Sequence, residues 1–290
     1  MERNLRCCFY FDFYFWLATC CFRLSKKLIS KWEVSIMNKL SVVIPLHDHI
    51  DSIERALNSV LNQYEKVDEI IVVDDGSTDG SLEFIQSYSC YNLKLIEQPG
   101  LGVAAALNKG VASARNAHVA FLDPADTWLP FFTLEMKKLE QQHPHLNIFA
   151  SRYQFVDSHQ NPADAKIRLP SANPNGFLLS SFYDANKRND LPFVISSMLI
   201  SKARFEKLGG FPIGNGIDAQ RDFLLKILER SEVLYSPNIH VHHQMKVNEN
   251  TDNSKLSAFF SLRLFGLMNG LPLNSVLTQS KTNYKKGWQL

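Results

Sequence analysis

Cysteine is scarce in the body of this 290-residue chain. Four of its five cysteines fall within the first 21 residues, and only Cys90 follows them. A disulfide framework or a thiolate metal site in the main domain is therefore excluded, which fits a protein of the reducing cytosol. We expect a cytoplasmic location.

The chain also lacks an excess of charge of either sign. Its 31 Lys and Arg residues oppose 29 Asp and Glu residues, for a net charge of +2. This balance gives no ground for expecting nucleic acid as a partner. With 45% hydrophobic residues, the composition is that of a globular protein with a substantial core.

A run long enough to span a membrane is missing from the N-terminal region. The stretch "CCFYFDFYFWLATCCF" contains Asp12 and has about 16 residues, whereas a spanning helix needs about 20. No small-residue cleavage site follows it, so it does not resemble a signal peptide. Two interpretations remain, a membrane-surface segment or upstream sequence before a true start at Met37. We favour the second and treat residues 1–36 as an extension outside the domain.

From Leu40 onward, apolar runs of strand length alternate with amphipathic stretches. "LSVVIP", "EIIVVDD", "LKLIEQ" and "HVAFLD" predict strands, and "DSIERALNSVLNQ", "TDGSLEFIQSY" and "GVAAALNKGVASAR" predict helices. We expect Asp51 to cap the first helix and Thr78 or Asp79 to cap the second. Repeated strand-helix units predict an α/β fold with a mostly parallel sheet flanked by helices.

The pattern loosens beyond Trp128, whose ring we expect in the core. Further helices are predicted at 130–142, shortly before Leu208 and at 218–230, and further strands at 147–156 and 193–201. Residues 157–192 are rich in Pro, Asn, Ser and Asp and predict long loops. The domain is expected to cover 37–254. The tail 255–290 contains an amphipathic stretch that we expect to pack on the domain, with peripheral membrane contact as the alternative.

Polar clusters follow the ends of the predicted strands. "PLHDH" closes the first strand, Asp74 and Asp75 the second, "QPGLG" the third, and Asp123 with Asp126 the fourth. Ligands of open parallel sheets bind at this edge. Clustered carboxylates repel one another unless a cation or a ligand rich in hydrogen-bond donors lies among them. A divalent cation that bridges a diphosphate would supply that partner.

A competing signal is the segment "GLGVAA", which fits the dinucleotide fingerprint with Asp123 roughly 20 residues further on. The fingerprint belongs in the first strand-helix unit, whereas this segment falls in the third. An NAD-dependent oxidoreductase is therefore a minor alternative.

Five segments together resemble the family 2 glycosyltransferases of the GT-A fold, which is Rossmann-like with a mixed C-terminal acceptor part. They are "SVVIPLHDHIDSIERALNSVLNQ", "IIVVDDGSTDGS", "GLGVAAALNKGVASA", "VAFLDPADTW" and "LISKARFEKLGGF". The resemblance implies transfer of a sugar from a nucleotide diphosphate sugar to a saccharide or lipid-linked acceptor, usually with inversion and with Mg²⁺ or Mn²⁺. Such enzymes act in glycan and polysaccharide biosynthesis.

The resemblance also implies site residues. Asp74 and Asp75 would hold the base and ribose, with Pro45 at the pocket wall, and Asp123 would contribute to the nucleotide site. Asp123 and Asp126 would hold the metal and diphosphate. A histidine after the last strand, His243 or else His242, would reach the metal or diphosphate.

Two departures from the family pattern concern the acidic residues. Ala125 stands where the family has an aspartate in "LDxDD". Ala219 and Gln220 stand at the acidic pair that supplies the general base, which leaves Asp218 and Asp222 as base candidates, or as surface residues, with Asp222 able to pair with Lys226. A degenerate, non-catalytic homologue that binds a nucleotide or glycan is the alternative that these positions suggest.

Overall fold

The structure, a computed structural model, describes residues 39–88, 90–157, 159–167, 176–179, 190–214 and 218–245. The predicted N-terminal extension and C-terminal tail lie outside the described residues, as does much of the predicted loop region 157–192. Within the described chain, no helix is both long enough and apolar enough to cross a bilayer.

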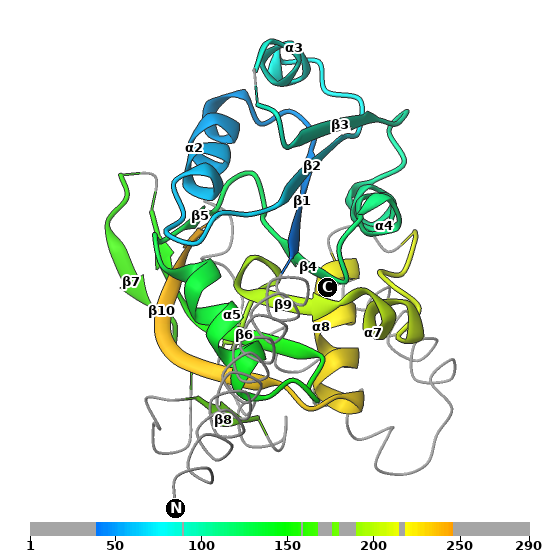
Figure 1. Ribbon diagram of the computed structural model, residues 1–290. Helices are drawn as coiled ribbons and strands as arrows, with labels where there is room; N and C mark the ends of the chain where they lie inside the picture. Colours follow the sequence, from blue (N-terminus) through cyan, green and yellow to red (C-terminus); the bar gives the residue numbers. More distant parts are fainter. Residues whose placement is uncertain are drawn as a thin grey trace, which may run out of the picture.

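A ten-stranded mixed sheet forms the centre of the described chain (Figure 1). Its order is β3-β2-β1-β4-β9-β6-β10-β5, with β7 beside β6 and β8 beside β10. The parallel strands are β1 (Leu40–Leu46), β2 (Glu69–Asp74), β3 (Leu93–Glu97), β4 (His118–Phe121), β6 (Ile148–Val156) and β10 (Leu234–Gln244). β9 (Met198–Ser201) lies antiparallel between β4 and β6, so the direction of β6 and β10 matches that of β4. The carboxyl ends of all six parallel strands therefore meet at one edge.

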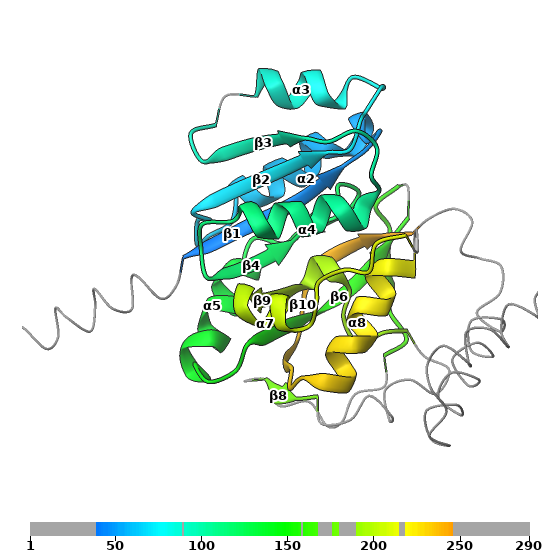
Figure 2. The ribbon, with the colours of Figure 1, turned by 90° about the vertical axis from the view of Figure 1, so that its right-hand side faces the viewer.

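Helices cover both faces of the sheet (Figure 2). On one face lie α2 (Ile50–Leu61), α3 (Ser81–Ser87) and α5 (Phe132–Gln142). On the other face lie α4 (Val103–Ser113), α7 (Lys202–Lys207) and α8 (Asp218–Arg230). A short 3-10 helix, η1 (Ile195–Ser197), precedes β9. The predicted α/β class with a mostly parallel sheet is confirmed.

Two close contacts explain why particular residues suit this packing. A Cβ atom on Gly110 of α4 would lie 2.3 Å from Val43 Cγ1, so only glycine lets this helix approach β1 so closely. Asn108, two residues earlier, donates to the carbonyl of Phe211 and accepts its N–H, each at 2.9 Å. Trp128 is buried against Phe132 with ring centroids 4.2 Å apart, which confirms its place in the core.

The turn after β2 holds the start of α2. Asp79 Oδ2 accepts the N–H of Ile50 at 2.8 Å, and Asp79 Oδ1 accepts the N–H of Ser81 at 3.0 Å. The N-cap of α3 is Gly80, so the prediction of Thr78 or Asp79 as the cap residue is wrong, although Asp79, one residue before the cap, accepts the first N–H of the helix. The prediction that Asp51 caps α2 is wrong, because the helix begins at Ile50, before Asp51. The carboxylate of Asp79 accepts the N–H of Ile50 instead.

Three short strands were not predicted from the sequence. β5 (Thr127–Trp128) pairs with β10, while β7 (Pro162–Asp164) and β8 (Phe177–Leu178) fall within the stretch predicted as loops. Strands of two or three residues are too short to show an alternating pattern, so their partners alone define them.

Replacement of Asp79 by alanine should destabilise the fold by about 1 kcal/mol, the usual cost of a lost helix cap. Burial raises the pKa of Asp79, but hydrogen bonds from the Ser81 side chain and from the N–H groups of Ile50 and Ser81 outweigh it, so the net pKa is lowered. The stabilisation is therefore present above the unfolded pKa and is lost as pH falls through the folded value. Urea unfolding across this pH range measures it. Asp51→Ala, in the first turn of the same helix, is the matched control and should cost less.

Replacement of Glu140 by glutamine should stabilise the protein at neutral and alkaline pH. Burial raises the pKa of Glu140 from 4.5 to about 7, beside His118, whose Nδ1 lies 3.1 Å from Glu140 Oε1. Because the folded pKa exceeds the unfolded one, the wild type loses stability as pH rises from 4.5 to about 7. Urea unfolding should show the advantage of the variant growing over this interval and then staying level. An advantage that did not vary with pH would contradict this assignment.

Candidate active site

The polar residues predicted at strand ends do meet at the carboxyl edge of the sheet. Asp74 ends β2, Gln98 follows β3, Asp123 follows β4, and His243 lies near the end of β10. Pro45 is the last but one residue of β1 and lies opposite Val73 of β2. The sheet topology therefore brings residues from four strands, up to 169 positions apart in the sequence, to one rim.

Two buried acceptor oxygens on this rim have no hydrogen-bond partner. Asp74 is 1% exposed, and its Oδ2 accepts the N–H groups of Gly76 and Ser77 while its Oδ1 has no donor. Gln98 is 6% exposed; its Nε2 donates to Asp75 Oδ1 at 2.8 Å, and its Oε1 has no donor. The carboxylate of Asp75 can only accept, which fixes the amide orientation of Gln98. Buried oxygens without donors are costly, so a ligand with N–H or O–H groups would satisfy them.

Asp75, by contrast, is occupied within the protein. Its Oδ1 also accepts the N–H of Leu101 at 2.6 Å, and its Oδ2 accepts the N–H of Gly102 at 2.7 Å. The carboxylate thus shapes the glycine-containing turn before α4, and its predicted contact with a nucleoside stays a prediction. The same bonds count against the oxidoreductase alternative, because a dinucleotide site would offer these N–H groups to a pyrophosphate.

Asp123 carries the more accessible carboxylate of the pair after β4. Its side chain is half-buried, its Oδ1 accepts the N–H of Ala125 at 3.0 Å, and its own N–H donates to Ser196 Oγ at 3.0 Å. Burial and the neighbouring Asp126 carboxylate raise the pKa of Asp123, against smaller lowering effects of Ala125, His243 and His49. A cation or a hydrogen-bond donor next to this carboxylate would relieve the repulsion.

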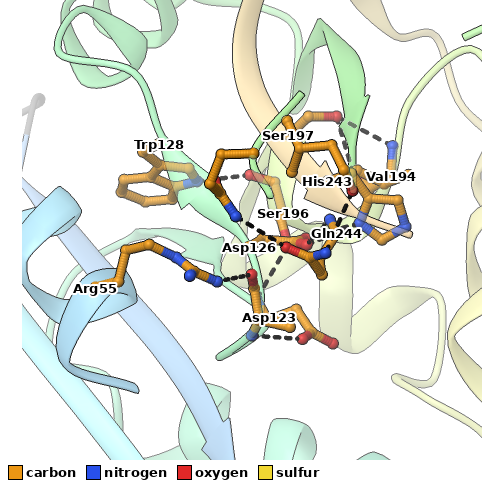
Figure 3. Close-up of polar contacts among 12 residues, drawn as sticks. Arg55, Asp123, Asp126, Trp128, Val194, Ser196, Ser197, His243 and Gln244 are labelled. Carbon is orange, nitrogen blue, oxygen red and sulfur yellow. Dashed lines mark hydrogen bonds and ion pairs between the residues drawn. The ribbon is translucent and has the colours of Figure 1, made fainter. Parts of the chain in front are cut away.

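Asp126 is 1% exposed and lies at the centre of a hydrogen-bond network (Figure 3). Ser196 Oγ donates to its Oδ2 at 2.5 Å, and the N–H of Gln244 donates to its Oδ1 at 3.0 Å. His243 Nδ1 lies 2.9 Å from both carboxylate oxygens. The network joins the turn after β4 to η1 and to the end of β10.

The structure therefore brings Asp123, Asp126 and His243 together, as predicted for a metal site, but it joins Asp126 to His243 directly. Throughout the described ranges, no group of three His, Cys, Asp or Glu side chains is arranged to hold a metal ion. A Mg²⁺ site is commonly made from one or two carboxylates completed by substrate phosphates. Asp123 fits such a site, because its carboxylate is half-buried, bears an unfavourable negative charge and makes a single N–H contact at one oxygen.

Arg55 of α2 reaches the same turn. Its guanidinium donates to the carbonyl of Ala125 at 3.1 Å and is exposed to solvent (Figure 3). The turn thus combines a carboxylate at 123, a methyl group at 125 and a cation supplied by a neighbouring helix. This arrangement places positive charge beside the turn that carries Asp123.

The base candidates lie at the start of α8. Asp218 is its first residue, and Asp222, one turn later, is half-buried. Ala219, which stands at a position of the acidic pair, is completely buried in the core between α8 and the sheet. Lys226 donates to the carbonyl of Leu208.

Sequence reasoning missed three residues of this rim. Gln98 lies within "QPGLG" and Ser196 within the predicted strand 193–201, but the sequence does not mark either as a site residue. His49, at the N-cap of α2, lies close enough to Asp123 to lower its pKa. Single polar residues beside apolar runs carry no spacing signal, and only their distant partners reveal their positions.

Comparisons with known proteins agree with this architecture. The family described as "Glycosyl transferase family 2" matches residues 41–208. An uncharacterized glycosyltransferase of Nostoc sp. is 42% identical over 95 residues, which is 32% of this chain and 30% of that protein. An uncharacterized glycosyltransferase of Escherichia coli is 37% identical over 95 residues, which is 32% of this chain and 28% of that protein. The chain therefore aligns with less than a third of the length of these relatives.

A solved structure of Staphylococcus aureus TarS, residues 1–349 in complex with UDP-GlcNAc, superposes with a TM-score of 0.60 at 18% identity. The superposition covers 79% of this chain and 66% of the TarS chain, which establishes the likeness in fold. The family match spans more than half of the chain and contains all but the first residue of β1, together with β2, β4 and the Asp123–Asp126 turn. The chain belongs to glycosyl transferase family 2.

Proposed function

We propose that the protein transfers a sugar from a UDP-sugar to an acceptor hydroxyl, with inversion at the anomeric carbon, in glycan or polysaccharide biosynthesis. Family membership supports glycosyl transfer, and the UDP-GlcNAc complex of the structurally similar TarS supports the donor class. The observation that carries the proposal is the pair of buried oxygens without donors, Asp74 Oδ1 and Gln98 Oε1.

A uridine nucleotide suits this pair of oxygens. Uracil presents one base N–H, at N3, and the ribose presents two hydroxyl groups, so one nucleoside offers donors to both acceptors. The two residues are neighbours across β2 and β3, since the N–H of Gln98 donates to the carbonyl of Asp74 at 2.8 Å. Pairing each oxygen with a ligand donor would remove a desolvation cost of about 1–3 kcal/mol per group.

The diphosphate would follow the rim from β2 toward β4. Arg55 and Asp123 flank the turn at its end, and Asp123 would hold Mg²⁺ or Mn²⁺ together with phosphate oxygens. A bound metal ion there would neutralise charge on the leaving diphosphate. His243, on β10, contacts Asp126 directly and lies close enough to Asp123 to lower its pKa.

The acceptor proton requires a base on the other side of the anomeric carbon. Asp218 and Asp222 are the carboxylates in the first half of α8, and either would take the proton as the hydroxyl attacks. The acceptor is a saccharide or a lipid-linked glycan. We place the enzyme in the cytoplasm, where a free thiol such as that of Cys90 stays reduced. Any peripheral contact with a membrane would involve the tail 255–290.

The second candidate, a non-catalytic homologue that binds the nucleotide or glycan, draws on one observation. Ala219 is buried and cannot act as a base, and Gln220 beside it carries no charge. The nucleoside rim is unaffected by these residues. Binding of UDP without turnover of any donor would favour this candidate over the enzyme.

Asp74→Asn should weaken UDP binding at least about tenfold, because an amide nitrogen would face the ligand donor where an acceptor is needed. Titration calorimetry measures the change. Asp68→Asn is the matched control: Asp68 also accepts a backbone N–H, that of Leu40, but at the opposite edge of the sheet. It should leave the UDP affinity unchanged.

A ligand change sharpens this test. UDP methylated at N3 of uracil lacks the base donor and should bind more weakly than UDP to the wild type. The N3 hydrogen would meet either Asp74 Oδ1 or Gln98 Oε1, and Asp74→Asn and Gln98→Ala each remove one of these oxygens. The variant that has lost the oxygen facing N3 should no longer distinguish UDP from its methylated form. Equal binding of both ligands to the wild type would contradict a donor-acceptor contact with the base.

Asp222→Asn or Asp218→Asn should lower the rate of sugar transfer by about 100-fold or more while UDP affinity is kept, as expected for loss of a general base. Glu229→Gln, an exposed residue further along α8, is the matched control. Full transfer activity in both aspartate variants would overturn the assignment of the base to this helix.

A further inference from the structure

We propose that Asp126 and Ser196 are positioning residues: Asp126 holds the hydrogen of His243 on Nδ1, which leaves Nε2 as the atom that His243 offers to the cation of the donor diphosphate. Ser196 fixes both Asp126 and the backbone of Asp123. Asp126 is then the outer partner of a histidine and not itself a metal ligand.

The contacts of Asp126 leave its carboxylate little room for another partner. It receives hydrogen bonds from Ser196 Oγ, from the N–H of Gln244 and from His243 Nδ1, all within 3.0 Å. Its side chain is 1% exposed, whereas that of His243 is 27% exposed. A metal ion at Asp126 would have to displace donors that the fold itself supplies from two other segments.

The imidazole contact decides how His243 presents itself. A carboxylate can only accept a hydrogen bond, so the nitrogen that faces Asp126 must carry hydrogen. In the neutral ring the other nitrogen, Nε2, then holds the lone pair. Histidines that bind metal ions commonly donate their second N–H to a carboxylate, which fixes the tautomer and the ring orientation.

Ser196 connects the two acidic residues of the turn. Its hydroxyl donates to Asp126 Oδ2 and accepts the N–H of Asp123, and its carbonyl accepts Trp128 Nε1–H at 2.7 Å (Figure 3). The residue is completely buried, so no water competes for these bonds. Loss of the hydroxyl would loosen the Asp126 carboxylate and the backbone that carries the Asp123 carboxylate.

The hydrogen position can be measured without any substrate. Long-range ¹H–¹⁵N correlation spectra of the full-length chain, at a pH where the ring is neutral, should show hydrogen on Nδ1 of His243. In Asp126→Asn, one amide oxygen must replace two carboxylate oxygens, so the population with hydrogen on Nε2 should increase. Addition of Mn²⁺ with UDP should broaden the His243 signals in the wild type and less so in the variant.

Kinetics separate this role from a general effect on folding. Ser196→Ala should lower kcat/KM for hydrolysis of UDP-GlcNAc by about tenfold, as expected for loss of a charge-assisted hydrogen bond. Ser197→Ala is the matched control: Ser197 is equally buried in the same turn, but its hydroxyl bonds only to the backbone of Val194. The control should keep its kcat/KM.

Three results would overturn the proposal: hydrogen on Nε2 in the wild type, a hydrogen position unchanged by Asp126→Asn, or equal kinetics for the two serine variants. The catalytic consequence rests on the proposed function, whereas the hydrogen position does not. A wild type that has hydrogen on Nδ1 but does not bind UDP would remove the proposed function and keep the positioning role of Asp126.

Discussion

Carboxylates that accept N–H and O–H groups hold the rim of this sheet together. Asp75 fixes the turn before α4, Asp79 joins the starts of α2 and α3, and Asp126 joins the turn after β4 to η1 and β10. Each carboxylate accepts hydrogen bonds from donors that would otherwise be unsatisfied at the end of a strand or helix. The rim is consequently built from acids that are not available to a ligand.

The acids that remain are then easier to interpret. Asp74 keeps one buried oxygen without a donor, and Asp123 keeps an accessible carboxylate with a raised pKa. These two residues stand at the two ends of the predicted ligand path, one where a nucleoside would lie and one where a diphosphate would end. The aspartates of the rim are thus of two kinds: some hold the backbone of the site in place, and others would face the proposed ligand.

The fold was largely predictable from the sequence, because buried parallel strands and amphipathic helices leave clear periodic patterns. The carboxyl edge also followed, since parallel strands must end together. What could not be predicted was the direction of each carboxylate. Asp126 meets Ser196, 70 positions further along, and His243, 117 positions further along. Adjacent aspartates such as Asp74 and Asp75 look equivalent in sequence, and only their partners distinguish them.

Ala125 illustrates how the surroundings alter the meaning of a single residue. In the sequence it is a missing carboxylate, and a missing metal ligand was the natural interpretation. In the structure, burial and the neighbouring Asp126 carboxylate already raise the pKa of Asp123, so a third acid in this turn would add to the repulsion. Arg55 bonds the Ala125 carbonyl and brings a positive charge to the same place. The alanine therefore keeps the negative charge of this turn lower, and for the proposed donor diphosphate the cation from α2 would supply part of the attraction that a further metal contact would otherwise have to provide.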